Sequence, residues 1–119
     1  MSKKLITTRL LKGEIRRHTL ANDITVSDAQ YAARLKRHFS VSRKESRHIL
    51  DCNQIRTIYQ DVFAAIIKVH QTLAKRGKRL VISVGDNARQ YSQYRCAFAS
   101  SGVCVCITEE AAILELSHS

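Results

Sequence analysis

Polar side chains gather where the most regular helical pattern of the chain begins. Tyr59, Gln60 and Asp61 directly follow Ile58 and open a segment that reads as a helix from about Gln60 to Arg76. The first turn of a helix leaves backbone N–H groups without partners and carries the positive end of the helix dipole. Such a start can hold a phosphate or a carboxylate. The side chain of Asp61 is therefore expected to cap this helix.

Patterns of known catalytic sites are absent from the sequence. The turn from Gly85 to Ala88 lacks the repeated glycines of a phosphate-binding loop, and neither HExxH nor GxSxG occurs. Asp51 ends a short apolar segment, where α/β folds bind ligands, but no nucleophile–base pair accompanies it. The five histidines are scattered, and His70 is interpreted as a boundary residue of the core rather than a base or ligand. We therefore predict a protein without catalytic activity and without a cofactor.

The four cysteines, Cys52, Cys96, Cys104 and Cys106, form no CxxC pair. Cys104 and Cys106 alternate within VCVCI, so on a strand they would share one face. A zinc site usually has more closely repeated ligands with histidines nearby. The favoured interpretation is small buried apolar residues in a reducing cytoplasm, with no metal bound; a metal or redox role is the less favoured one.

Length predicts a single domain, residues 1–119, and the interpretation of the cysteines as reduced predicts a location in the cytoplasm. The chain has 119 residues and is 45% hydrophobic, enough for one modest core. It contains no run of about 18 apolar residues, so no membrane span is expected.

The net charge of +10 is concentrated in residues 1–47, which carry twelve Lys or Arg and four Asp or Glu. An acidic partner would fit this half: nucleic acid, an anionic membrane or an acidic protein. A solvated basic surface is the alternative, and the aromatic content of 6% argues against RNA binding. The candidate contact residues are Arg16, Arg17, Arg34, Lys36, Arg37, Arg43, Lys44 and Arg47.

The hydrophobic pattern predicts nine elements in the order β-β-α-β-α-β-α-β-α. Ser27 and Gln30 have the spacing of a capping box, Gly77 suits a left-handed helix end, and Thr108 suits the start of the last helix. Strands that alternate with single helices predict an α/β fold with a mixed, mostly parallel sheet of four to five strands and about four helices. Strands are expected at 4–11, 14–20, 48–52, 79–84 and 103–107, and helices at 25–39, 60–76, 88–101 and 109–116.

The helix over 60–76 is expected to bury one apolar stripe. This stripe consists of Phe63, Ile66, Ile67, Leu73 and Ala74, with Val62, Val69 and His70 beside it.

From His48 on, the chain resembles the STAS domain of bacterial anti-sigma-factor antagonists and of sulfate-transporter tails. HILDCNQIRTIYQDVFAAIIKVHQTLAKRGKRLVIS has the family's order: a strand ending in an acidic residue, a short turn, a helix ending in an RG pair, and an apolar strand. Phe63 takes the family's leucine position, and Gly77 its helix-stop glycine. SSGVCVCITEEAAI resembles the closing segment. Residues 1–47 fit less well, with 13–15 or 22–24 in the place where the second strand ends.

The resemblance implies that the family's usual switch is lost. The Asp-Ser-(Ser/Thr)-Gly positions fall on Tyr59, Gln60, Asp61 and Val62, so Gln60 replaces the serine that regulated members phosphorylate. The Asp61 carboxylate is then a helix cap or, less favoured, a permanent mimic of the modified state. Tyr59 and Thr57 remain as alternative hydroxyl groups.

The resemblance further implies a non-enzymatic module for protein–protein interaction and regulation. Its partner would be an anti-sigma or kinase-like protein, or a membrane transporter component, since some ABC-type lipid transport systems carry a small STAS subunit. A nucleic-acid-binding protein is the second hypothesis, and an α/β enzyme or nucleotide binder rests on fold analogy alone. The predicted partner-binding residues are Asp51, Asn53, Arg56, Thr57, Tyr59, Gln60, Asp61, Asn87 and Arg89.

Overall fold

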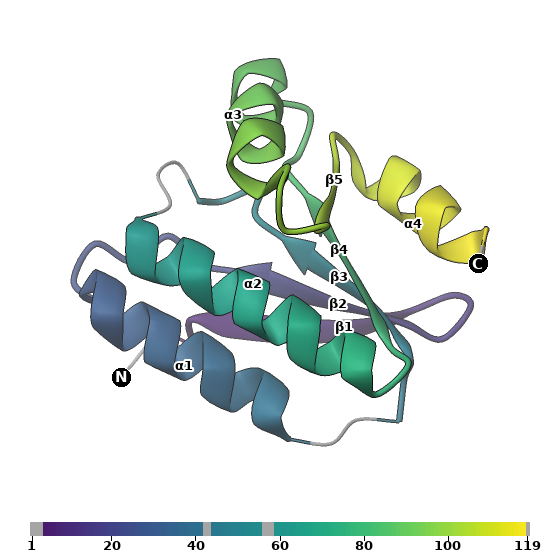
Figure 1. Cartoon of the computed structure of the whole chain (residues 1–119), viewed down its shortest axis with the longest axis horizontal. Helices are drawn as coiled ribbons and strands as arrows, with labels where there is room; N and C mark the ends of the chain where they lie inside the picture. The colour runs from purple at the N-terminus through teal and green to yellow at the C-terminus, as the bar shows by residue number, and fades with distance from the viewer. Residues whose placement is uncertain (1–3, 42–43, 56–58, 119) are drawn as a thin grey trace.

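One five-stranded sheet organises the molecule (Figure 1). The computed structural model describes residues 4–41, 44–55 and 59–118. The strands lie in the order β1-β2-β3-β4-β5; β1 pairs with β2 antiparallel, and all later pairs are parallel. The elements are β1 (Ile6–Leu11), β2 (Ile15–Leu20), α1 (Asp28–Ser40), β3 (Arg47–Asp51), α2 (Gln60–Lys75), β4 (Arg79–Ser83), α3 (Ala88–Phe98), β5 (Cys104–Cys106) and α4 (Glu109–Ser117).

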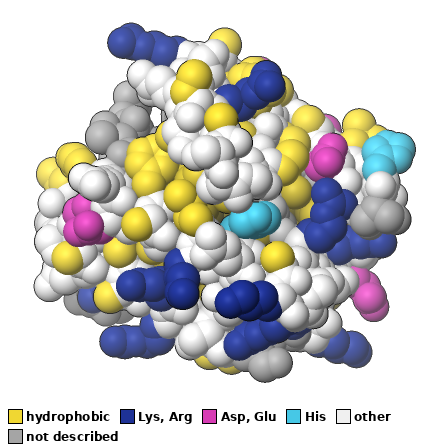
Figure 2. Space-filling model, in the orientation of Figure 1, with side chains coloured by type: hydrophobic (Ala, Val, Ile, Leu, Met, Phe, Trp, Pro, Cys, Tyr) yellow, Lys and Arg dark blue, Asp and Glu magenta, His cyan; other side chains and the backbone are white. Residues whose placement is uncertain are grey.

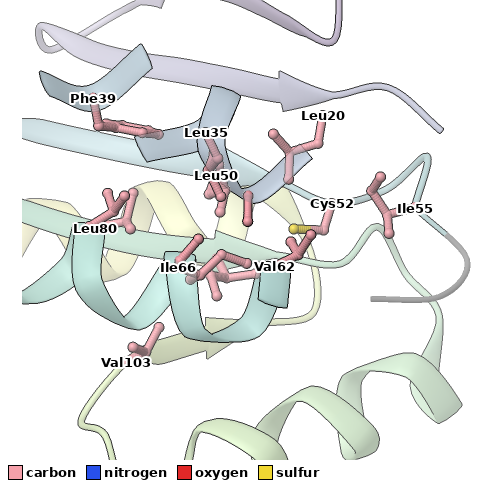
Figure 3. Close-up of a cluster of buried hydrophobic side chains, with 14 of the residues drawn as sticks. Leu20, Leu35, Phe39, Leu50, Cys52, Ile55, Val62, Ile66, Leu80 and Val103 are labelled. Atoms are coloured by element: carbon pink, nitrogen blue, oxygen red, sulfur yellow. The ribbon is translucent and has the colours of Figure 1, made fainter. Parts of the chain in front are cut away.

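The sheet has a core on each face, because neighbouring strand residues point to opposite sides. Leu50 and Ile82 face the larger core with α1, α2 and α3, whereas Ile49 and Val81 face the smaller one with α4. Figure 3 shows the larger core, where Leu35 of α1, Leu50 of β3 and Ile66 of α2 are among the side chains that meet between the helices and the strands. α1 and α2 lie side by side on this face, and α4 covers the other.

The predicted fold class and element order are confirmed. Most boundaries differ by one to three residues, and the last strand is shorter than expected because only Cys104–Cys106 pairs with β4. No described helix is both long and apolar enough to cross a bilayer.

Local signals predicted several helix ends correctly. Ser27 and Gln30 form the capping box of α1, and the hydroxyl oxygen of Thr108 accepts the N–H of Ala111 at 3.1 Å. Gly77 ends α2 with a φ of 72°, and the N–H of Lys78 donates to the oxygen of Leu73 at 2.9 Å. These are short-range hydrogen bonds, so the sequence alone carries their information.

The apolar stripe of α2 differs from the predicted one. Ala74 is exposed, Phe63 and Ile67 are half-buried, and the buried residues are Val62, Ala65, Ile66, Val69 and Leu73. The reason is that α2 packs against both the sheet and α1, which moves the centre of its buried face around the helix. Phe63 lies at the edge and contacts the Phe98 ring of α3, with centroids 4.9 Å apart.

Two neighbouring isoleucines test this assignment. Ile66→Ala should lower the free energy of unfolding by about 2–5 kcal/mol, because the side chain is fully buried. Ile67→Ala should cost less than half of that value, since Ile67 is only partly covered. Urea denaturation of both variants measures the difference, and equal costs would restore the originally predicted stripe.

Candidate functional site

The carboxyl ends of the parallel strands and the starts of α1 and α2 lie at one end of the molecule, toward the left and top of Figure 1. The loops that follow β2, β3 and β4 meet there. In open α/β sheets this is the end where ligands bind. Every aspartate of the chain lies in these loops, at the end of a strand or in a first helical turn: Asp23, Asp28, Asp51, Asp61 and Asp86.

The start of α2 is capped by a carboxylate from another helix. Asp28, the first residue of α1, accepts the N–H of Asp61 at 2.9 Å through Oδ2 and the N–H of Val62 at 3.1 Å through Oδ1. The prediction that Asp61 caps the helix was therefore wrong about the residue, because Asp61 lies inside the first turn with an exposed side chain. Sequence spacing could not indicate a cap from 33 residues earlier in the chain.

Tyr59 and Gln60 border this capped start. Tyr59 is the N-cap residue and its side chain makes no capping hydrogen bond; its side chain is 62% exposed. Beside it lies a cavity of about 310 Å³, lined among others by Tyr31, Ile55 and Val62. Ile24, at the rim of this cavity, is 92% exposed. The surface around the start of α2 therefore combines apolar side chains with carboxylates.

Asp51 and Asn53 shape the loop after β3. The carboxylate of Asp51 accepts the N–H of Asn53 at 3.0 Å and the hydroxyl of Thr19 at 3.3 Å. The side chain of Asn53 packs against Gly85, where a Cβ would lie 2.3 Å from its Oδ1. Gly85 also has a φ of 78°, so both its backbone and its neighbour require glycine.

Gln90 connects the start of α3 to the loop after β3, a role that the sequence did not indicate. Its buried side-chain amide donates to the backbone oxygens of Ile55 at 2.7 Å and Cys52 at 3.3 Å. Asn87 caps α3 by accepting the N–H of Gln90 at 3.0 Å. A glutamine in an amphipathic helix usually faces solvent, so only the packed structure identifies its role.

The described members of the predicted partner surface lie at this end of the molecule. Tyr59, Gln60, Asp61, Asn87 and Arg89 are all exposed there. Asn53 is exposed as well, whereas Asp51 is half-buried and positions the loop. Arg56 and Thr57 lie outside the described residues.

The predicted basic contacts do not form one surface. Arg16 pairs with Glu45 on the α1 side of the sheet, and Arg17 pairs with Glu109 at 2.8 Å on the α4 side. Arg34, Lys36 and Arg37 are exposed on α1, and Figure 2 shows Lys and Arg side chains along the lower side of the molecule. Lys44 is exposed, Arg47 is half-buried, and Arg43 lies outside the described residues.

The cysteines are less uniformly buried than expected. Cys52 is fully buried, which raises the pKa of its thiol, but Cys96 is exposed and Cys104 and Cys106 are half-buried. Interaction with the neighbouring Cys106 thiol lowers the pKa of the Cys104 thiol to about 7. No three His, Cys, Asp or Glu side chains of the described part are arranged to hold a metal ion.

No known family profile and no curated protein matches the sequence. Solved structures do match. A serine-to-glutamate variant of RsbS from Moorella thermoacetica superimposes with a TM-score of 0.70 at 9% identity, over 97% of both chains. The NMR structure of TM1081 gives 0.72 at 9% identity, covering 100% of this chain and 94% of the other.

The crystal structure of TM1081 from Thermotoga maritima, a candidate anti-sigma factor antagonist, gives a TM-score of 0.64 at 10% identity over 94% of both chains. At these identities the likeness concerns the fold. The chain therefore has the fold of these structures, and the STAS-like α/β architecture expected from the sequence is confirmed.

Two glycines with the same backbone conformation test the packing of the site. Gly85→Ala and Gly77→Ala should share a strain of about 1 kcal/mol from their positive φ. Gly85→Ala should lose clearly more stability, since only its new methyl group meets Asn53. Adding Asn53→Gly to Gly85→Ala should reduce this extra loss in the free energy of unfolding, as measured by urea denaturation. Equal costs for the two alanine variants would contradict the contact.

Proposed function

We propose that the protein is a non-enzymatic, cytoplasmic STAS-type module that binds a protein partner through the start of α2 and the loops after β3 and β4. The fold supports this class of function, and one observation supports the site. The start of α2 holds a fixed carboxylate, Asp28, beside exposed Tyr59 and Asp61. A partner would meet apolar and acidic groups on one exposed surface.

The Asp28 cap supports regulation without the usual phosphoserine. The backbone N–H groups of Asp61 and Val62 could bind a phosphate, but the Asp28 carboxylate already accepts both. Gln60 offers no hydroxyl group for phosphorylation. The docking surface would therefore stay in one electrostatic state, and binding would be controlled by the abundance of the partner or by another residue.

We prefer an anti-sigma or kinase-like partner over the two alternatives, because a solved structure with this fold is a candidate anti-sigma factor antagonist. A nucleic-acid role is weakened because Arg16 and Arg17 are both ion-paired and face opposite sides of the sheet. A transporter component, as in ABC-type lipid transport, would use the same docking end. Co-purification with mass spectrometry separates these classes by the identity of what is recovered.

Matched charge reversals test the docking surface. Tyr59→Ala with Asp61→Lys should reduce recovery of the specific partner at least tenfold, because both side chains are exposed at the start of α2. Glu14→Lys, an equal reversal at the opposite end of the sheet, should leave recovery unchanged. If both variants bind as the parent protein does, the start of α2 is not the docking surface.

Removing the Asp28 carboxylate tests whether it occupies an anion site. Asp28→Ala should lower the free energy of unfolding by about 0.5–2 kcal/mol, the usual cost of a lost helix cap. Inorganic phosphate should then raise the melting temperature of the variant more than that of the parent, at matched ionic strength. Asp23→Ala, which leaves α2 capped, serves as the control. An identical phosphate response in all three proteins would show that no anion site was uncovered.

A further inference from the structure

Three of the five histidines, although far apart in the sequence, form a hydrogen-bonded chain. His38 of α1 lies with Nε2 2.8 Å from Nδ1 of His18 in β2. His18 lies with Nε2 2.9 Å from Nδ1 of His48 in β3. His48 Nε2 then lies 2.9 Å from the backbone oxygen of Glu45. His18 and His48 are fully buried, and His38 is half-buried.

The carbonyl at one end sets the direction of the hydrogen bonds. A carbonyl oxygen only accepts, so Nε2 of His48 carries a hydrogen. In the neutral ring Nδ1 of His48 is then an acceptor, and Nε2 of His18 donates to it. By the same argument Nε2 of His38 donates to Nδ1 of His18. Three neutral rings thus satisfy all three hydrogen bonds in a single tautomer, with the hydrogen on Nε2.

The number of hydrogens in the intact chain is limited. Each of the two N···N contacts has room for one hydrogen, and Nε2 of His48 holds a third. Only Nδ1 of His38 can add a fourth. Three neutral imidazoles carry three hydrogens, so the intact chain binds one extra proton at most. A second proton would place N–H against N–H in one of the contacts.

We propose that His38, His18 and His48 form one proton-binding site, here termed the histidine relay, which holds at most a single shared proton and latches α1 onto the sheet. Binding of further protons requires the relay to open. The Phe39 ring, 4.5 Å from the His18 ring, covers the relay from α1. An opened relay therefore releases the C-terminal half of α1.

Cationic side chains surround the relay. The carboxylate of Glu45 lies near His48 and already pairs with Arg16, which holds the pKa of Glu45 below its usual value. Next to His38 on α1 lie Arg34 and Arg37, and Lys44 and Lys78 lie in the adjoining loops. Among the strand residues paired with His18 and His48, Thr8 of β1, Leu50 of β3 and Leu80 of β4 carry no charge, and Arg16 of β2 is cationic. The buried face of α2 is apolar.

The proton count predicts how stability depends on pH. In the unfolded chain all three histidines bind protons as the pH falls through about 6.5. The folded relay binds one or none, so unfolding takes up two to three protons. Stability therefore rises with pH in this range and is lost below it. The change in the unfolding equilibrium constant should steepen as the pH falls below about 6.5 and approach about 100-fold per pH unit near pH 5.

The relay also connects to the opposite end of α1. The first residue of that helix is Asp28, whose carboxylate caps α2. Release that extends to the first turn of α1 would withdraw this carboxylate, so acid should then loosen the start of α2. The amide signals of Asp61 and Val62 should then follow the opening of the relay. The test of the relay itself does not depend on the proposed docking function, because no partner is needed.

NMR of the histidine rings and pH-dependent urea denaturation test the inference. At pH 7.5 all three rings should show the Nε2–H tautomer, and between pH 8 and 5.5 the folded relay should take up one proton at most. In the parent the single added proton should appear through Nδ1 of His38, and His38→Gln should keep His18 and His48 as neutral Nε2–H tautomers while the protein is folded; His70→Gln, outside the relay, is the control and should keep the ring signals of the parent relay.

His18→Gln removes the central ring and should disrupt the relay more than His38→Gln does. Should His18→Gln not fold, His38→Gln still tests the relay, because His38 is only half-buried. Folded protein in which two relay rings are fully protonated would overturn the proposal. A relay ring that shows the Nδ1–H tautomer in the folded parent at pH 7.5, or an unfolding equilibrium of the parent that does not change between pH 7 and 5.5, would overturn it as well.

Discussion

The carboxylate of Asp28 on the first N–H groups of α2 is the contact on which the arrangement of the site depends. It joins the starts of two neighbouring helices through two hydrogen bonds of 2.9 and 3.1 Å. The negative charge lies at the positive end of the α2 dipole, where it is favourable. The same contact fixes the position of Tyr59 and Asp61 relative to α1. The same two hydrogen bonds therefore influence both the packing of α1 against α2 and the geometry of the proposed docking surface.

Charge in this protein follows the helix dipoles more than the two halves of the sequence. Asp28 and Asp61 lie in first turns, as do Glu109 and Glu110 of α4, whereas Arg37 and Lys75 lie in last turns. Because α1 and α2 run side by side in the same direction, their acidic starts meet at the carboxyl end of the sheet. The excess of cations in residues 1–47 is spread over α1 and both faces of the sheet, so it does not define one binding surface.

Buried polar groups in the larger core restrict how its helices, strands and loops can be placed, because their hydrogen bonds have directions that apolar contacts lack. Gln90 holds the loop after β3, and the histidine relay spans β2, β3 and α1. Such groups are tolerated because each is hydrogen-bonded; an unpaired one would cost about 1–3 kcal/mol. The hydrogen bond between His38 and His18 links α1 to β2. The cost is a dependence on protonation that a purely apolar core does not have.

The sequence by itself determined the order of strands and helices, the caps of α1 and α4, and the end of α2 at Gly77, because these depend on periodicity and on hydrogen bonds between residues close in the chain. Only the tertiary structure decided which carboxylate caps α2, which face of α2 is buried, and which histidines meet. Asp28 and Asp61 are 33 residues apart, and His18 and His48 are 30 apart. Their pairing results from the crossovers that place α1 beside α2 and β2 beside β3, and a one-dimensional pattern does not record those distances.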